Sequence, residues 1–264
     1  MYPDSPEIPR ALEKYAQEIK ATERESIAFK VKTATDLKLW HSKVGGMPYL
    51  PVGEKYPCDS KGYPLTFLMQ INFSEIPPLL DYPTEGILQF YINETDDLMG
   101  LDFDNPTNQE GFRVLYFQTI ENDESKLQSG VPNSESNSED YTGCGPLDKN
   151  CILGMEFYRE KQYITPFDYR FDKSISFAHD YDIVDVYQEA LGTSGHRIGG
   201  YPHFTQTDPR VNHEEFQEYE LLVQLDSDGN GILWGDMGIG AFFIHPNDLK
   251  DCNFSKVLYN WDCC

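Results

Sequence analysis

Basic residues are scarce in this sequence: its 264 residues include 21 Lys and Arg against 44 Asp and Glu, a formal net charge of −23. A surface this acidic repels a phosphate backbone, so direct binding to nucleic acid is not expected. Long apolar runs are lacking too, because no stretch reaches the roughly 18 residues that a membrane helix needs. The sequence therefore predicts neither a nucleic-acid-binding surface nor a membrane span.

Cysteine pairs with the spacing of a metal or redox site are also absent. None of the six cysteines forms the C-x-x-C pattern of a zinc ribbon or a thioredoxin-like motif. The first residues lack the basic and apolar regions of a secretory signal, so we expect reduced thiols and a cytoplasmic location. Cys263 and Cys264 resemble a prenylation signal in position, but no polybasic stretch precedes them, and no chemistry is assigned to them.

Aromatic residues, in contrast, are abundant: they make up 14% of the chain, with 17 Tyr and 16 Phe. Such a chain can bury a sizeable core by itself, so neither a metal nor a cofactor is expected. A periodicity of about 3.6 residues predicts helices near 5–22 and 182–191. Segments rich in β-branched or aromatic residues between turn residues predict strands near 26–32, 65–73, 86–93, 112–120, 152–158, 219–226, 232–234 and 241–244.

The strongest pattern is an internal repeat with a constant offset of 154 residues. Lys-Val-Gly-Gly-Met-Pro at 43–48 resembles Arg-Ile-Gly-Gly-Tyr-Pro at 197–202, and Leu-Met-Gln-Ile-Asn at 68–72 matches Leu-Val-Gln-Leu-Asp at 222–226. An aromatic segment follows in each half, at 86–92 and 238–244. Two matches with one shared offset are hard to obtain by chance, so we predict that the chain is duplicated.

These patterns predict one compact unit over residues 1–264, with an α+β fold of predominantly antiparallel strands and a few helices. The N-terminal half, residues 1–120, holds the first repeat at about 40–120. The C-terminal half, residues 151–264, holds the second at about 194–264, and a pseudo-twofold axis would relate the two. Residues 121–150 are rich in acids, Ser and Asn, which is typical of a long exposed connection.

The repeated motifs also carry a family resemblance. Segments 43–48, 67–72, 86–91 and 234–238, with the ending Tyr-Asn-Trp-Asp-Cys-Cys at 259–264, resemble the YwqG family of uncharacterised bacterial proteins. The resemblance covers most of the chain from about residue 40 onward. It implies a soluble α+β protein with a duplicated architecture and no established catalytic residues. The family also looks like one found near bacterial toxin–immunity loci, which is an associational hint.

Each half places a Gly-Gly-x-Pro loop before a strand that contains a central glutamine. Adjacent glycines allow positive φ and could present N–H groups to an anion, but a tight turn into a strand is the favoured interpretation. Gln70 and Gln224 lie among apolar residues, and a buried amide needs hydrogen-bond partners. We predict that both are buried and bond to backbone groups of nearby loops, with a bound ligand as the alternative.

Motifs for metal binding and covalent catalysis are only partly matched. Asp-Ser-Asp-Gly-Asn-Gly at 226–231 begins like a calcium loop, but Met237 stands where the bidentate Glu belongs, so a hairpin turn is favoured. His213 is followed by two acids, yet the H-E-x-x-H zinc motif is absent. No Gly-x-Ser-x-Gly elbow indicates a nucleophilic serine.

These observations favour a binding or interaction protein whose acidic surface holds a basic protein, such as a nuclease-type toxin. The alternative is a hydrolase-like enzyme with its site between the two halves, and a small-molecule ligand is not excluded. Function should lie where the halves differ, at His196, Arg197, Trp234 and Asp236, which we expect to converge in one concavity. Arg offers a planar fork for carboxylate or phosphate, and Trp a large amphipathic surface.

Overall fold

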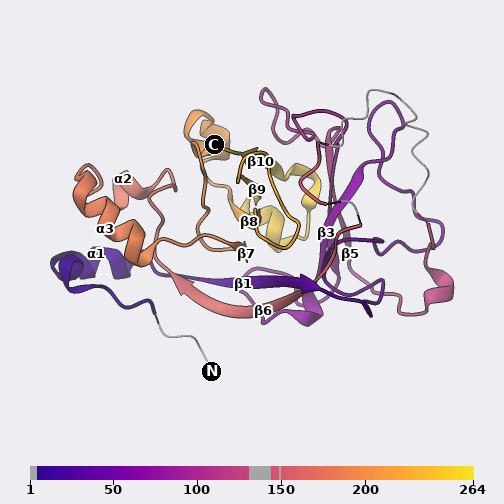
Figure 1. Cartoon of the computed structure of the whole chain (residues 1–264), viewed down its shortest axis with the longest axis horizontal. Helices are drawn as coiled ribbons and strands as arrows, with labels where there is room; N and C mark the ends of the chain where they lie inside the picture. The colour runs from indigo at the N-terminus through magenta and orange to yellow at the C-terminus, as the bar shows by residue number, and fades with distance from the viewer. Residues whose placement is uncertain (1–4, 131–143, 149) are drawn as a thin grey trace.

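One large antiparallel sheet organises the molecule, as seen in a computed structural model that describes residues 5–130, 144–148 and 150–264 (Figure 1). Its ten strands join in the order β10-β9-β8-β7-β1-β6-β2-β3-β4-β5. Every pairing between these strands is antiparallel. The strands are β1 (Arg24–Thr33), β2 (Lys43–Gly45), β3 (Thr66–Asn72), β4 (Ile87–Ile92), β5 (Phe112–Phe117), β6 (Ile152–Gln162), β7 (His196–Ile198), β8 (Glu220–Asp226), β9 (Ile239–Ile244) and β10 (Leu258–Asp262).

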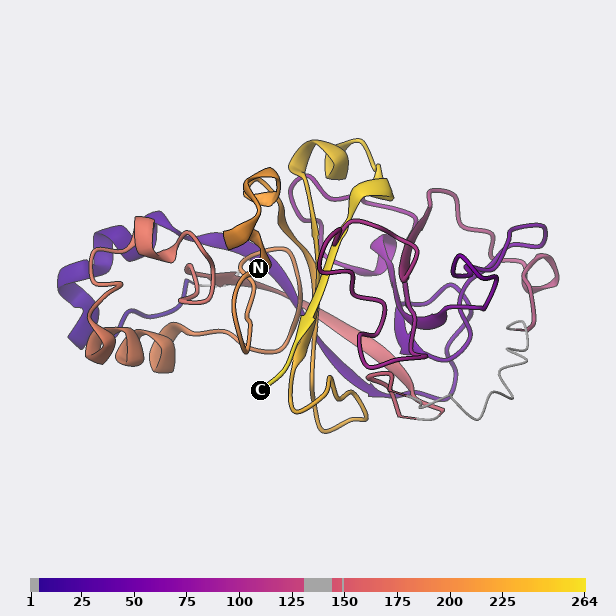
Figure 2. The ribbon, with the colours of Figure 1, turned by 90° about the horizontal axis from the view of Figure 1, so that it is seen from above.

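Helices are short, and α1 to α3 gather beyond one end of the long central strands β1 and β6 (Figures 1 and 2). Among the described residues, no helix has the length and apolar character required to cross a lipid bilayer. The α-helices are α1 (Ala16–Ala21), α2 (Phe171–Ser174), α3 (Tyr181–Leu191) and α4 (Pro246–Lys250). The 3-10 helices are η1 (Arg10–Tyr15), η2 (Phe73–Glu75), η3 (Glu124–Lys126), η4 (Pro209–Asn212), η5 (Glu214–Phe216) and η6 (Phe254–Lys256).

The predicted α+β class is wrong, because the protein is mostly β. The longest α-helix, α3, has 11 residues, and the others have four to six. Helices this short do not form a layer that covers the sheet. The sheet covers itself instead: it curls until it is nearly closed, and its two ends pack against each other across a common core.

Aromatic contacts show how the two ends of the sheet meet. The ring of Phe90 in β4 lies 4.6 Å from that of Phe242 in β9, measured between centroids. Phe112 in β5 packs 5.1 Å from Tyr259 in β10. All four side chains are at most 1% exposed and belong to one cluster that draws on both halves of the chain. Burial of this apolar area, at about 25 cal/mol per Å², is the main force that curls the sheet.

The two ends of the sheet also share a hydrogen-bonding register. Lys43 pairs with Gln70 between β2 and β3, and Arg197 pairs with Gln224 between β7 and β8, 154 residues later. A register shift interrupts the pairing of β3 with β4 and that of β8 with β9 at matching places. Strands β1 and β6 form the central pair, with β2 to β5 on one side and β7 to β10 on the other.

Some predicted elements differ from those observed. Residues 232–234 form isolated bridges and no strand, and the short strands β2 and β7 and the last strand β10 were not predicted. Part of the predicted connection is tied to the N-terminal half, since the N–H of Gln128 donates to the carbonyl of Leu50 at 2.8 Å. The Asn, Ser and acid run at 133–140 lies outside the described residues.

Candidate functional site

The two central glutamines hold the glycine loops in place. Gln70 and Gln224 are both 0% exposed, which confirms their predicted burial. Gln70 accepts the N–H of Tyr49 at 2.9 Å and donates to the carbonyl of Leu39 at 2.7 Å. Gln224 accepts the N–H of His203 at 2.8 Å and donates to the carbonyl of Gly195 at 2.8 Å. Each amide thus bonds to backbone groups of its own half, on both sides of the glycine loop.

His196 is enclosed by protein. Its Nδ1 accepts the N–H of Asp226 at 3.0 Å, so the ring proton lies on Nε2, which is 3.3 Å from the carboxylate of Asp228. The ring stacks on Phe29 at 5.1 Å. Burial lowers the pKa of His196, although Asp228 opposes this. With both ring nitrogens engaged, His196 is a neutral structural side chain and not a poised general base.

Arg197 is also enclosed by protein, with 1% of the residue exposed. Its Nη1 donates to the hydroxyl of Thr193 at 2.9 Å and its Nη2 to the carbonyl of Ser194 at 2.8 Å. Its Nε lies 3.5 Å from a carboxylate oxygen of Glu160 but has no hydrogen-bond partner among the residues that the structure describes. Burial lowers the pKa of Arg197. The guanidinium fork therefore fixes the turn that precedes β7.

Trp234 and Asp236 follow the turn at 226–231, and the N–H of Trp234 donates to the hydroxyl of Ser227 at 2.9 Å. Trp234 is 0% exposed, and its ring centroid lies 6.2 Å from that of Trp261. Asp236 is exposed, and its backbone carbonyl accepts the N–H of Cys264 at 3.4 Å. Because Arg197 and Trp234 are fully buried, the four predicted residues do not line one open concavity. The predicted convergence is not observed.

The calcium-like segment closes on itself as a turn. The N–H of Asp228 donates to the carbonyl of Ile232 at 2.9 Å, and its side chain accepts the N–H of Asn230 at 2.8 Å. Burial opposes ionisation of Asp228, but hydrogen bonds from Asn230 and His196 lower its pKa overall. Across the described ranges, no three His, Cys, Asp or Glu side chains gather closely enough to hold a metal ion.

A surface that the sequence analysis did not single out lies on the loop between β4 and β5, residues 93–111, which we call the acidic loop. This loop crosses to β10 and bridges the two edge strands of the sheet (Figure 2). The carbonyl of Pro106 accepts the N–H of Tyr259 at 3.0 Å, and the carbonyl of Leu98 accepts the indole N–H of Trp261 at 2.7 Å. Met99 and Leu101 reach into the main core and are 4% and 8% exposed. These bonds and anchors hold the loop in one place.

The outward side of the acidic loop combines apolar groups with negative charge. Phe103 is 69% exposed and Leu98 43% exposed. Residues 94–110 contain six acids and no Lys or Arg. The acids are Glu94, Asp96, Asp97, Asp102, Asp104 and Glu110. An exposed Phe on a fixed, acidic loop is a ready contact for a cationic surface that carries an apolar depression.

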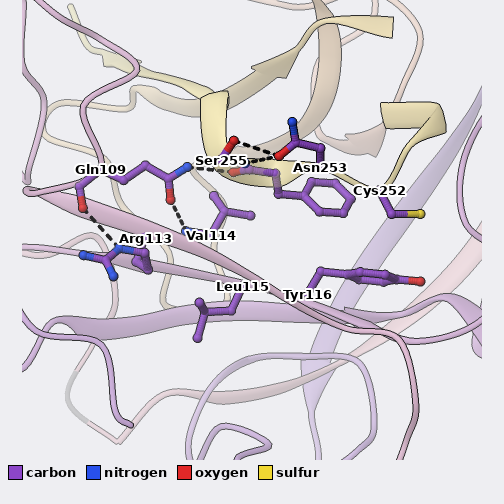
Figure 3. A pocket seen from close by; sticks show the side chains of 9 residues that line it. Gln109, Arg113, Val114, Leu115, Tyr116, Cys252, Asn253 and Ser255 are labelled. Carbon is purple, nitrogen blue, oxygen red and sulfur yellow. Dashed lines mark hydrogen bonds between the residues drawn. The ribbon is translucent and has the colours of Figure 1, made fainter. Parts of the chain in front are cut away.

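Near the C-terminal end of the acidic loop, Gln109 hydrogen-bonds the loop to the rest of the protein (Figure 3). Its Oε1 accepts the N–H of Val114 in β5 at 2.9 Å, and its Nε2 donates to the carbonyl of Phe254 at 2.7 Å. A cavity of about 440 Å³ lies beside this bridge, lined in part by Tyr116 and Cys252. Burial raises the pKa of Tyr116 to about 12, so its hydroxyl stays protonated and donates to the carbonyl of Glu85 at 2.9 Å.

One signal for this surface was present in the sequence. Residues 94–110 carry six acids and no Lys or Arg between two strands, but residues 212–228 have the same count, so the signal was not distinctive. What the sequence did not show is which apolar residues of the segment face outward. Leu98 and Leu101 are three residues apart, yet one is exposed and the other belongs to the core.

Comparison with known proteins places the chain in one family. A family model described as a domain of unknown function, DUF1963, matches residues 42–263. The matched range contains both glycine loops, both central glutamines and the acidic loop. None of the curated proteins compared with the chain matches it.

Proposed function

Because this chain belongs to the DUF1963 family, whose description assigns no activity, we propose a function from the geometry: the protein holds a basic protein partner against its acidic loop. The observation that carries this proposal is the exposure of Phe103 and Leu98 within a segment of six acids and no cations. Buried aromatic anchors supply most of the energy of many interfaces. The surrounding carboxylates would speed association with a cationic partner and select against acidic ones.

The fixed position of the acidic loop supports the proposal. A loop that is already ordered loses little conformational freedom when a partner binds, so more of the contact energy appears as affinity. The loop is bonded to β10 through Pro106 and Leu98 and to the segment near Phe254 through Gln109. The net charge of −23 adds a long-range field of the same sign.

We also propose that the protein is YwqG-like within its family, on the motifs at 43–48, 67–72 and 259–264. A cytoplasmic location suits its six free thiols. A nuclease-type toxin is the partner class that we favour, because an enzyme that binds nucleic acid presents a cationic surface. The hydrolase alternative stays a prediction, and the burial of Arg197 and Trp234 does not favour it.

The experiment compares capture of partners by the wild-type chain with capture by a double variant, Leu98→Ser with Phe103→Ser. Val52→Ser is the matched control, since Val52 is 66% exposed and lies outside the acidic loop. We expect the wild type and the control to retain the same partner with a pI above about 9, and the double variant to bind it at least tenfold more weakly, about 1.4 kcal/mol. Asp97→Asn with Asp104→Asn should slow association severalfold at low salt and have little effect at 1 M salt, where the screening length is about 3 Å.

Two results would reject this function. The first is a partner that the double variant binds as tightly as the wild type does. The second is a set of specific partners that are neutral or acidic. Thermal melting of each variant shows whether lost binding reflects lost folding.

A further inference from the structure

A second pocket, separate from the acidic loop, lies between the N-terminal and C-terminal halves of the chain. Its volume is about 450 Å³, within the range of about 300–1,000 Å³ that is usual for small-molecule sites. The N-terminal half supplies residues 79–82 and the start of β1, and the C-terminal half supplies Gly199, Gly200, Leu221 and part of α4. We call it the inter-half pocket.

The wall at residues 79–82 is pinned to the C-terminal half by specific contacts. The hydroxyl of Tyr82 donates to the carbonyl of Leu221 at 2.8 Å, and the carboxylate of Asp81 pairs with Lys250 at 3.4 Å. Gly199 has a φ of +69°, and an added Cβ would lie 2.9 Å from Cδ2 of Leu79. The glycine is needed for its backbone conformation, and the missing Cβ leaves room for the side chain of Leu79. The glycine loop thus shapes a pocket.

The body of the inter-half pocket is apolar. Leu79, Leu80, Leu221 and Leu249 are among its lining residues. Leu80 is 84% exposed, a large value for a leucine beside a pocket. An apolar ligand in the pocket would cover Leu80 and gain about 25 cal/mol for each Å² of apolar surface removed from water.

The pocket is also lined by Arg24 and Glu220, the last two members of a series of ion pairs. The order of contacts is Arg24–Glu220–Arg170–Asp168–Arg210–Asp208, in which cations and anions alternate. Arg24 is the cationic end of the series, and among the described residues it pairs with one carboxylate, that of Glu220, which it shares with Arg170. Glu25 also lines the pocket, but its carboxylate pairs with Arg159 at 3.6 Å.

Only part of the Arg24 guanidinium is hydrogen-bonded to the protein. Its Nη1 donates to Glu220 at 2.6 Å, and within the described ranges Nε and Nη2 make no hydrogen bond to protein. The guanidinium stacks over the ring of Tyr201 at 4.7 Å, which fixes its orientation. Its side chain is 37% exposed, so a ligand can reach it. A carboxylate is the group that matches a free edge of a guanidinium.

We propose that the inter-half pocket binds a small organic carboxylate with an apolar body. The carboxylate accepts hydrogen bonds from Arg24, and the apolar body lies along Leu79, Leu80, Leu221 and Leu249. A free fatty acid and the C-terminus of an apolar peptide share this chemistry. The site is independent of the acidic loop, because the two have no lining residue in common.

The test is a titration of the full chain with octanoate, 1-octanol and octylammonium. Binding is measured by calorimetry and by the NMR shifts of methyl groups. We expect saturable binding of octanoate, at least tenfold weaker binding of 1-octanol, and no binding of octylammonium at these methyl groups. N-acetyl-leucyl-leucine is the fourth probe. If it binds more tightly than octanoate, the natural ligand is a peptide C-terminus; if more weakly, it is a free organic acid.

Two variants connect the binding to the proposed residues. Arg24→Gln should weaken octanoate at least tenfold and change 1-octanol less than twofold, because only the carboxylate loses its partner. Leu80→Glu should also weaken octanoate at least tenfold by placing a charge beside the apolar body. Val52→Glu makes the same change at an exposed site outside the pocket and should have no effect.

Some outcomes would overturn the proposal. They are an absence of octanoate binding to the folded wild-type chain at millimolar concentration, or equal binding by Leu80→Glu and wild type. An unchanged preference for octanoate over 1-octanol in Arg24→Gln would overturn it as well. Melting curves of both variants show that they are folded, and Leu80→Glu alters only an exposed side chain, so it keeps the test decisive if Arg24→Gln is unstable.

Discussion

Lys43 in β2 is a buried amine, and its titration should change the stability of the folded protein. Only 3% of the residue is exposed, and its Nζ donates to the carbonyl of Leu39 at 3.0 Å and to that of Lys38 at 3.3 Å. Burial lowers the pKa of Lys43 from 10.5 to about 8, while the charge of Glu75 opposes this. The folded protein therefore holds this proton more weakly than the unfolded chain does.

The sign of the pH effect follows from this difference. Between about pH 8 and pH 10.5 the unfolded chain keeps the proton that the folded protein has released, so stability rises with pH in this window. At 1.36 kcal/mol per pH unit, the full window corresponds to about 3 kcal/mol. Most of this, about 2 kcal/mol, should appear between pH 7 and pH 10. Below pH 8 the folded state carries the whole penalty of the buried charge.

The assay measures the free energy of unfolding in urea at pH 7, 8, 9 and 10, for the wild type and for Lys43→Met. Subtracting the unfolding free energy of the variant from that of the wild type removes the contribution from titration of the tyrosines and the other lysines. We expect this difference to rise by about 2 kcal/mol across the range. Lys61→Met, a change at an exposed lysine, is the control. A flat difference for Lys43→Met would refute the argument from burial.

Two further substitutions test the repeated core and the packing of Trp234. Gln224→Leu should destabilise the protein by about 2–4 kcal/mol in urea unfolding, because it leaves the N–H of His203 and the carbonyl of Gly195 without a partner; a loss below about 1 kcal/mol would contradict the bracing role of this amide. Gly240→Ala should cost about 1–3 kcal/mol and shift the tryptophan fluorescence, because the added Cβ would overlap the ring of Trp234; an unchanged spectrum and stability would show that the ring has room to move.

Much of the local structure could be predicted from the sequence. The segments that became β1, β3, β4, β5, β6, β8 and β9 were identified from their aromatic and β-branched residues, because those side chains suit a pleated, half-buried surface. Strands β2 and β7 were missed, because three residues are too few to show a period. The burial of Gln70 and Gln224 was also predictable, since an amide among apolar residues in a strand is carried into the core with them.

The candidate sites depended on contacts between distant parts of the chain. Trp234 was expected to line an open concavity, yet it is buried: it packs against Trp261, 27 residues later, and against Gly240, whose missing side chain leaves room for the ring. Phe103 is exposed because the neighbours of its loop, Met99 and Leu101, take the places in the core. The pocket at Arg24 exists only because residues 79–82 reach across to the second glycine loop.

Seven of the longer strands, the 154-residue offset and the acidity can be read from the sequence, since they depend on local residue patterns, on a comparison of segments or on composition. The fold class, in contrast, follows from long-range contacts, because whether a sheet is covered by helices or by itself depends on pairs such as Phe90 and Phe242, 152 residues apart. Apolar side chains are attracted to any apolar surface without direction. Which surface each one meets is therefore settled by the whole chain at once.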